Sequence, residues 1–341
     1  MRRTGGLFEG AVTFPALCAA ARRAARGKGK SGSAARFLFD LEPEVLRLMR
    51  ELEDGSYRPG SYRSFVLADP KPRTISAAPF RDRVVHHAVC AVLEPVFERS
   101  AVFDSYACRR GKGQRAALRR VQHFARRTEW YLKLDVAKYF ENVDHATLKA
   151  LLRRRLKDAR LLALLDRIIE AGAPGSPAGR GLPIGNLTSQ HFANFYLEPL
   201  DHFIQEELRP RGSCRYMDDF VLLSGDREPL VAAHAAIDRF LRERLQLRLK
   251  SAGTRLLPVR DGVPFLGFRI RPRLVRFDAA RARRFRARVR ALERLSWAAA
   301  LDEETKARSA QSLFGWAMHG DTREFRRSFL ARLRRDGILT D

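Results

Sequence analysis

Two adjacent carboxylates, Asp218 and Asp219, are the residues of this sequence best suited to chemistry. Short apolar runs flank them, Tyr216-Met217 before and residues 220–223 after. Such runs around a polar pair predict a tight β-hairpin with the acids at its tip. Neighbouring carboxylates repel unless a cation neutralises them, and a hard divalent ion such as Mg²⁺ suits that task. An ordinary surface turn would contain the same dipeptide, so the rest of the chain must decide.

A third acid, Asp135, stands near the end of a predicted strand. Along that strand, apolar residues alternate with polar ones, and the apolar residues are Trp130, Leu132, Leu134 and Val136. Period two indicates a half-buried strand, and Asp135 then leaves the face opposite these residues. An acid in this place is often a solvated edge residue. It becomes a metal-ligand candidate only if it approaches Asp218.

A basic hairpin is predicted earlier in the chain. Residues 62–67 and Thr74-Ile75 indicate two strands, and the turn between them contains Lys71 and Arg73 beside two prolines. Proline limits the flexibility of such a tip. A solvated charged turn is the alternative, but a second basic cluster at residues 81–83 follows closely and favours phosphate binding.

The charge of the whole chain points to a polyanionic partner. The 341 residues include 65 Lys and Arg against 39 Asp and Glu, which gives a net charge of +26. A surface this basic favours nucleic acid first and an anionic membrane second. No apolar run approaches the roughly 18–20 residues that span a bilayer. We therefore expect no membrane association.

The N-terminus and the cysteines indicate a cytoplasmic protein. Residues 1–23 superficially resemble a signal peptide, but Glu9 and Pro15 interrupt the apolar stretch and a basic helix is favoured. The cysteines are far apart and lack metal-type spacing: Cys18, Cys90, Cys108 and Cys214. They are expected to be reduced thiols.

Further elements follow from periodicity and turn residues. Helices are predicted over 37–52, 84–97, 114–127, 147–170, 230–245 and from 279 onward. Strands are predicted at 247–250 and 265–270. The adjacent His86-His87 pair lies on the 84–97 helix and is expected to be core or interface rather than a ligand pair.

Three helix boundaries are predicted from individual residues. Asp144 is the expected N-cap of a helix that begins near His145. Thr188 or Ser189 is expected to cap a long aromatic helix, which Pro199 should kink.

In this order and spacing, the motifs resemble reverse transcriptases of bacteria and phages, most of all the enzymes of diversity-generating retroelements. The resemblance covers about residues 35–320. The matching order is a basic finger hairpin, Leu-Asp-Val-Ala-Lys-Tyr-Phe, Leu-Pro-Ile-Gly-Asn-Leu-Thr-Ser-Gln, Tyr-Met-Asp-Asp, Phe-Leu-Gly-Phe and a basic helical thumb. Each element alone is weak, but the set is specific.

The resemblance implies an α+β right-hand polymerase with an antiparallel palm sheet flanked by helices and a helical thumb. The implied divisions are a basic N-terminal extension at 1–34, fingers at 35–110 and 143–187, palm at 111–142 and 188–277, and thumb at 278–341.

It also implies a two-metal site. Asp135 and Asp218 would be the ligands of two Mg²⁺ ions, with Asp219 beside them and the Val136 carbonyl as a further ligand. Two such ions about 4 Å apart can activate a primer hydroxyl and stabilise the leaving pyrophosphate. Acids on two strands can meet if those strands are neighbours in one sheet.

Nucleotide-binding residues are implied as well. Lys71 and Arg73 would hold the incoming triphosphate, with Lys250 near it. Phe140 matches a steric gate that would exclude a ribose 2′-hydroxyl; a core aromatic is the alternative. Phe265-Leu266-Gly267 matches a primer-gripping turn.

One motif departs from most reverse transcriptases, which have Gln-Gly followed by Ser-Pro. This chain has Ile184-Gly185, then Ser189-Gln190. Gly185 permits close backbone approach to a ligand, whereas Ile184 cannot make the hydrogen bonds of a glutamine. The resemblance therefore implies error-prone copying of template adenines in mutagenic retrohoming.

The same resemblance implies several partners: a template RNA, the RNA–cDNA duplex, dNTPs and an oligomer of a small basic helical accessory protein. A bacterial or phage-encoded cytoplasmic enzyme is expected. Two alternatives stay open, namely another bacterial reverse transcriptase (retron, group II intron-like or phage-defence) and a non-catalytic RNA-binding scaffold. A scaffold has no need of all three acids.

Overall fold

A computed structural model describes residues 3–27, 32–68, 72–297 and 302–335. In it the chain divides into two units, each assembled from three separate segments. The first comprises Met1–Val102, Val136–His202 and Asp238–Arg248, and the second comprises Phe103–Asp135, Phe203–Ile237 and Leu249–Asp341. Residues far apart in the sequence therefore meet inside each unit.

The first unit is mostly helical and packs around one long helix, α5 (Phe80–Ser100), which is buried on several sides. Helices α2 (Phe14–Ala25) and α10 (Leu187–Tyr196) contact it. Its His86 is buried, as the sequence predicts. The other helices that begin in this unit are α1 (Leu7–Ala11), α3 (Gly32–Phe39), α4 (Leu41–Glu53), α7 (Tyr139–Asn142), α8 (His145–Arg155), α9 (Ala159–Glu170) and α11 (Glu198–Phe203).

The basic hairpin of the first unit consists of two antiparallel strands, β1 (Arg63–Leu67) and β2 (Arg73–Ala77). Phe65 pairs with Ile75 at the centre of the register. Along β1 every residue is exposed, so only β2 packs against the rest of the unit. The predicted hairpin is therefore present, although Lys71 lies outside the described residues.

The second unit is built on a four-stranded antiparallel sheet with the order β4-β5-β3-β6. Its strands are β3 (Trp130–Asp135), β4 (Gly212–Tyr216), β5 (Asp219–Ser224) and β6 (Arg255–Pro258). The central strands β5 and β3 are apolar along most of their length, which is why they are flanked on both sides by other strands. Helix α12 (Glu228–Leu245) follows β5.

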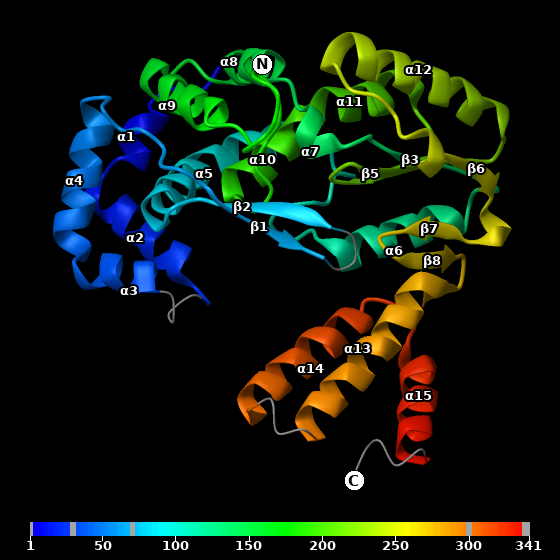
Figure 1. Cartoon of the computed structure of the whole chain (residues 1–341). Coiled ribbons are helices and arrows are strands. Elements are labelled where there is room, and N and C mark those ends of the chain that lie inside the picture. Colours follow the sequence, from blue (N-terminus) through cyan, green and yellow to red (C-terminus); the bar gives the residue numbers. More distant parts are fainter. Residues whose placement is uncertain (1–2, 28–31, 69–71, 298–301, 336–341) are drawn as a thin grey trace. The chain divides into compact units, whose positions relative to one another are not determined.

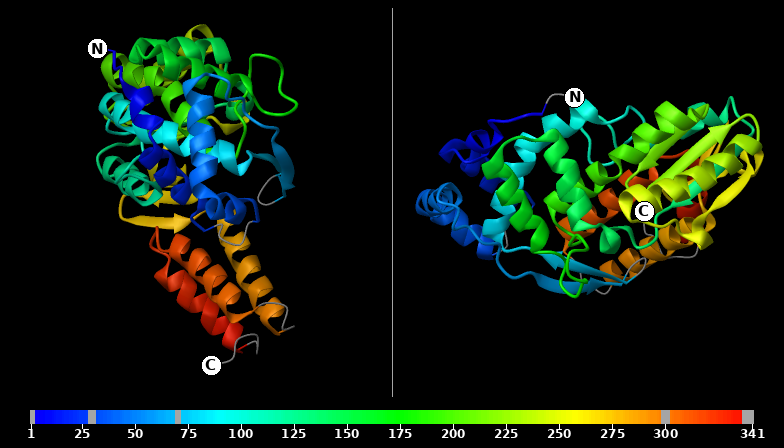
Figure 2. Two further views of the ribbon diagram at one scale, coloured as in Figure 1. Left: turned by 90° about the vertical axis from the view of Figure 1, so that its left-hand side faces the viewer. Right: turned by 90° about the horizontal axis from the view of Figure 1, so that it is seen from above.

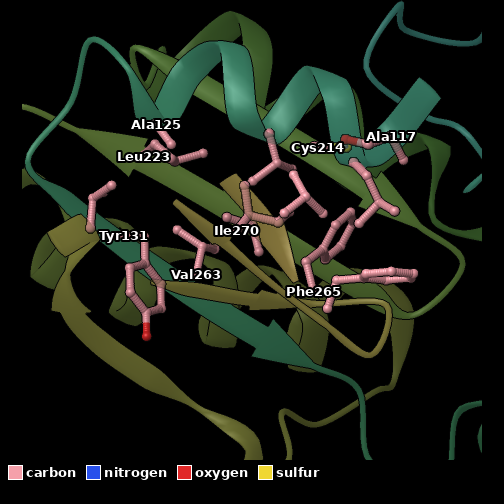
Figure 3. Close-up of a cluster of buried hydrophobic side chains, with 14 of the residues drawn as sticks. Ala117, Ala125, Tyr131, Cys214, Leu223, Val263, Phe265 and Ile270 are labelled. Carbon is pink, nitrogen blue, oxygen red and sulfur yellow. Dashed lines mark hydrogen bonds between the residues drawn. The ribbon is translucent and has the colours of Figure 1, made fainter. Parts of the chain in front are cut away.

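A second, smaller sheet joins the first around a shared core. It has three antiparallel strands, β7 (Val263–Phe265), β8 (Phe268–Arg271) and β9 (Leu274–Phe277). Helix α6 (Gln114–Ala125) contacts both sheets. Figure 3 shows the apolar cluster between them, with Ala117 of α6, Leu223 of β5 and Phe265 of β7 directed inward.

Three helices follow the small sheet: α13 (Ala279–Trp297), α14 (Glu303–Ala317) and α15 (Arg323–Arg335). They form the orange-to-red bundle of Figure 2. Phe285, Phe329 and Leu333 are buried among them and form a separate aromatic-rich cluster. The bundle has the basic helical character that the sequence predicts for residues from 279 onward.

Two strand predictions need correction. Residues 247–250 do not form a named strand, and the fourth strand of the large sheet is β6 instead. The stretch is extended and its backbone bonds to the end of β3, with the Lys250 N–H donating to the Asp135 carbonyl (2.9 Å). The single strand expected at 265–270 is a hairpin, because residues 266–267 form a turn between β7 and β8.

The helix boundaries are a mixture of right and wrong predictions. Asp144 does cap α8, and its carboxylate accepts from the Thr147 N–H at 2.8 Å. The long aromatic helix does break before Pro199. Its N-cap, however, is Asn186 rather than Thr188 or Ser189, and no side chain supplies a capping bond there.

Two global observations complete the fold. Within the described residues, no helix has both the length and the apolarity required to cross a bilayer. None of the four cysteines, all within the described residues, is in a disulfide, and Cys18, Cys90 and Cys214 are buried.

Candidate functional site

The hairpin of β4 and β5 places two acids at one end of the strands of the large sheet. Tyr216 pairs with Asp219, which leaves a two-residue loop of Met217 and Asp218. Met217 has a φ of 56°, in the left-handed region that bulky residues rarely adopt. The buried Arg215 holds this loop, because its Nη1 donates to the Met217 carbonyl at 3.0 Å. Such maintained strain is common at functional sites.

The register of the sheet brings the third acid to the same place. Asp135, the last residue of β3, pairs with Asp219, the first residue of β5. Side chains of directly opposed residues in an antiparallel pair have Cβ atoms about 4.5–5.5 Å apart. The condition that the sequence left open, namely that the strands of Asp135 and Asp218-Asp219 be neighbours, is therefore met.

Burial and neighbouring charge change the acidity of Asp218 and Asp219. Burial, and after it the nearby charge of Asp135, raise the pKa of Asp218 to about 6. Burial also raises the pKa of Asp219, although Lys133 opposes that shift. Groups that resist losing their protons in this way are typical of sites that await a compensating cation.

Two lysines partly balance the acids. Lys133 Nζ lies 2.5 Å from Asp219 Oδ1, and Lys250 Nζ lies 3.7 Å from Asp135 Oδ2. Lys250 is the exposed residue predicted to lie near a triphosphate. The sequence reading missed Lys133, although its position two residues before Asp135 on the same strand face was a usable signal.

The acids suit a hard divalent metal. Asp219 Oδ1 is buried and accepts no well-aligned hydrogen bond from the described residues, so its contact with Lys133 is an ion pair. In the described part of the chain, no group of three or more His, Cys, Asp or Glu side chains forms a ready metal cluster. Mg²⁺ commonly binds one or two carboxylates and completes its octahedral shell with water and substrate phosphates. A partial set of carboxylates therefore fits Mg²⁺, and the carbonyl of the adjacent Val136 stays a predicted ligand.

Within the first unit, backbone contacts join the predicted nucleotide-binding segments. The Ser76 N–H on β2 donates to the Ile184 carbonyl at 2.8 Å. The Leu182 N–H donates to the Phe140 carbonyl at 2.7 Å. The strand that begins at Arg73, the 184–185 turn and the Phe140 helix are thus one connected group.

Gly185 is required where the turn meets the hairpin. Its φ is 117°, and a Cβ there would lie 2.8 Å from Ile75 Cγ2. Ile184 is half-buried, while Gln190 is exposed on α10. The close approach expected at Gly185 is therefore made to the hairpin itself.

Phe140 stands at the start of a short helix after a sharp bend. Lys138 before it has a φ of 44°, and the buried Tyr139 hydroxyl donates to the Ala193 carbonyl. Tyr139 is thereby fixed in the core of its unit, and Phe140, the next residue, remains half-buried. Half-burial fits a gate better than a fully packed core residue, and the gate stays a prediction.

The match to known families agrees with this arrangement. The model of the family described as reverse transcriptase (RNA-dependent DNA polymerase) matches residues 68–270, which include all three acids. The chain therefore belongs to the reverse transcriptase family.

Relatives and a solved structure extend the comparison. Protein YkfC of Escherichia coli K12 is 29% identical over 273 residues, covering 67% of this chain and 72% of that protein. The group II intron-encoded protein LtrA of Lactococcus lactis is 27% identical over 170 residues, which are 48% of this chain and only 28% of LtrA. An apo telomerase from Candida tropicalis has a similar fold, with a TM-score of 0.51, 12% identity and coverage of 64% of this chain and 55% of that one.

Proposed function

We propose that this protein is an RNA-directed DNA polymerase that extends a primer by two-metal nucleotidyl transfer. The observation that supports this most directly is the register pair of Asp135 and Asp219, with Asp218 in the adjoining loop. Two Mg²⁺ ions bound there would activate the primer 3′-hydroxyl and stabilise the leaving pyrophosphate. Phosphoryl transfer needs positioning and charge neutralisation more than covalent help, and this site is built for both.

The chain's own residues divide the remaining work. Asp135, Asp218 and the Val136 carbonyl are the proposed metal ligands, with Asp219 beside them. Lys133 offsets the charge of Asp219. The exposed Lys250 ammonium, 3.7 Å from Asp135 Oδ2, is proposed to contact a triphosphate.

Nucleotide selection is assigned to the first unit. Lys71 and Arg73 are proposed to hold the triphosphate, and Phe140 to exclude the ribose 2′-hydroxyl. Gly185 and Gln190 belong to the same nucleotide-binding group. The backbone bonds that join β2, the 184–185 turn and the Phe140 helix support a common role for these segments.

We further propose that the enzyme belongs to a diversity-generating retroelement and copies template adenines inaccurately. Ile184 supports this, because its side chain offers no hydrogen bond and its backbone carbonyl is already occupied by Ser76. The proposed partners are a cognate template RNA, the RNA–cDNA duplex, dNTPs and an oligomer of a small basic helical accessory protein.

A second candidate within the family is a group II intron-like reverse transcriptase. Its support is the similarity to LtrA, whose printed description is a group II intron-encoded protein. The neighbouring DNA separates the two subtypes. A pair of near-repeats that differ at adenines, beside a small helical reading frame, would favour the retroelement.

The activity is tested by Mg²⁺-dependent dNTP incorporation on a primed RNA, with Asp218→Ala as the inactive control. We expect incorporation by the wild-type chain and none by Asp218→Ala. Salt-sensitive RNA binding without incorporation, under every template, primer and accessory condition, would favour a non-catalytic scaffold instead.

The fidelity proposal has its own test. Sequencing of cDNA made by Ile184→Gln should show fewer errors at template adenines than the wild-type product. Unchanged adenine errors would contradict the role of Ile184.

A further inference from the structure

The basic loop that precedes α6, residues 103–113, presents an aromatic ring to solvent. The first residue of the loop, Phe103, is 66% exposed, whereas the four residues after it are buried. A single exposed apolar side chain is common at protein surfaces and by itself indicates no function. Phe103 differs from that ordinary case because cationic side chains lie against its ring.

Cationic and aromatic side chains alternate around Phe103. Lys112 Nζ lies 3.3 Å from the centroid of the Phe103 ring, and the guanidinium carbon of Arg120 lies 5.3 Å from the same centroid. Arg120 also lies 4.3 Å from the centroid of the Phe124 ring. All three distances are within the range of a cation–π interaction. These four residues, Phe103, Lys112, Arg120 and Phe124, are called the Phe103 platform below.

Hydrogen bonds fix the two cations of the platform. Lys112 Nζ donates to the Phe103 carbonyl at 2.8 Å. Arg120 forms a bidentate pair with the buried Asp104, through Nε at 2.7 Å and Nη2 at 3.0 Å. Such a pair fixes the plane of the guanidinium as well as its position. Because Asp104 offsets its charge, Arg120 supplies the platform mainly with a fixed flat face.

The backbone of the loop is bonded to the edge of the large sheet. The Arg215 N–H on β4 donates to the Asp104 carbonyl at 2.9 Å, and the Tyr106 N–H donates to the Arg215 carbonyl at 3.0 Å. The Gly113 N–H then closes the loop on the Tyr106 carbonyl at 3.0 Å. The loop is therefore ordered before any ligand binds, in the same unit as Asp218, and binding there requires little further ordering.

The charge around the platform favours a polyanion. Residues 101–127 contain eight Lys and Arg and a single acid, Asp104, which is already paired with Arg120. Three arginines of this stretch are exposed, namely Arg110, Arg115 and Arg119. A basic surface that also presents an aromatic face fits a nucleic-acid strand, whereas a basic protein partner would be repelled.

We infer that the Phe103 platform binds the RNA template and stacks one of its unpaired bases on the exposed ring of Phe103. Bases inside a duplex are already stacked on their neighbours, so a protein ring is open only to an unpaired base. The choice of strand rests on the proposed function. Growing cDNA is paired as it is made, whereas the template ahead of it is single-stranded.

The test measures binding, so it does not depend on nucleotide incorporation. Fluorescence anisotropy of the full chain, without Mg²⁺ or dNTP, gives Kd for a primed RNA with an unpaired 5′ overhang and for the same duplex with a blunt end. Phe103→Ala should raise Kd for the overhang RNA about 10-fold, the order of one lost base–aromatic stack, and should leave Kd for the blunt duplex unchanged. Because the ring carries no charge, the slope of log Kd against log salt concentration should equal that of the wild type.

Two further variants and one control identify the aromatic face as the cause. Phe103→Leu keeps the apolar bulk without an aromatic face, so it should lose as much affinity as Phe103→Ala, and it replaces that variant if the alanine chain does not fold. Phe103→Trp offers a larger face and should bind the overhang RNA at least as tightly as the wild type. Phe39→Ala is the matched control, since Phe39 is 90% exposed but lies on α3 of the first unit, and its Kd should equal that of the wild type.

The outcomes separate this inference from the proposed function. Wild-type affinity for the overhang RNA in both Phe103→Ala and Phe103→Leu would overturn the inference and leave the proposed function intact. An equal loss of affinity for the blunt duplex would also overturn it, as would an effect on free single-stranded DNA with none on RNA of the same sequence. A wild-type chain that binds the overhang RNA as expected but incorporates no nucleotide would contradict the proposed function alone.

Discussion

The two tight turns of the second unit, β4–β5 and β7–β8, solve the same backbone problem for different purposes. Each has a bulky apolar residue at positive φ, Met217 at 56° and Leu266 at 50°. In each, a side-chain donor holds the carbonyl of that residue at 3.0 Å, Arg215 in the first and Gln114 in the second. The first turn presents a carboxylate, whereas the second presents only its backbone.

The two turns therefore differ in their proposed roles, since only the first carries a proposed metal-site acid. The acids of the first turn are costly to bury, as the raised pKa of Asp218 indicates. The second turn carries no acid, and its Leu266 carbonyl accepts from Gln114 Nε2. Changes in the two turns should therefore have unequal effects.

The largest expected effect is on the rate when an acid is removed. Asp135→Asn keeps the shape of the side chain and removes the charge proposed to bind metal, so nucleotide incorporation should fall by roughly 1,000-fold or more. Steady-state extension of a primed RNA measures this. Asp226→Asn, at an exposed acid just after β5, is the control and should be active. Equal activity of the two variants would remove Asp135 from the site.

The next effect distinguishes the two side chains that donate to the turn carbonyls, Arg215 and Gln114. Arg215 is buried, and its backbone also bonds to Asp104 and Tyr106. Arg215→Met should lower both the rate and the free energy of unfolding, the latter by about 2–4 kcal/mol, since buried polar partners lose their bonds. Gln114→Met, at a half-buried residue, should lower the free energy of unfolding by less than Arg215→Met. Urea unfolding and kinetics on both variants check this, and equal stability losses would erase the distinction.

A smaller effect concerns stability and pH. The pKa of Asp218 is about 6 in the folded state and 3.8 by reference, so the folded state retains a proton that the unfolded state has lost. Stability should therefore fall as pH rises from about 4 to 6 and level off above. In EDTA, Asp218→Asn should be more stable than the wild type by about 1–3 kcal/mol at pH 8.

The same measurement at low pH supplies the contrast. The advantage of Asp218→Asn should shrink as pH falls through 6 and vanish near pH 4. Thermal unfolding across this range follows it, and an advantage that does not change with pH would contradict the assigned cause.

The smallest effect is expected in the second turn. Asparagine tolerates positive φ better than leucine, and Leu266→Asn keeps the backbone carbonyl that accepts from Gln114. Stability should change by no more than about 1 kcal/mol, since better turn geometry offsets lost apolar contact. The rate should equal that of the wild type in the same extension assay. A large loss of rate would mean that the leucine side chain, rather than the backbone, matters.

Local pattern was enough to predict several elements. The alternation at 130–136 predicts strand β3, although Tyr131, expected on the face opposite the core, is fully buried. The acid cap at Asp144 and the apolar run of α5 determine their structure through neighbours in the sequence. The strand predicted at 247–250 was wrong for a related reason. Four alternating residues fit any extended segment, and whether it becomes a strand depends on which distant chain pairs with it; β6 takes that place beside β3.

The sequence alone proposed the acids of the candidate site, through their places beside apolar runs and through the family resemblance. Only the tertiary structure decided that Asp135 pairs with Asp219, since register is a property of two strands from distant segments. Only it joined Gln114 to both Leu266 and Trp316, because hydrogen bonds of an amide with a backbone carbonyl and an indole leave no mark in composition or period. Chemistry was readable from residue types, and its positioning from the fold.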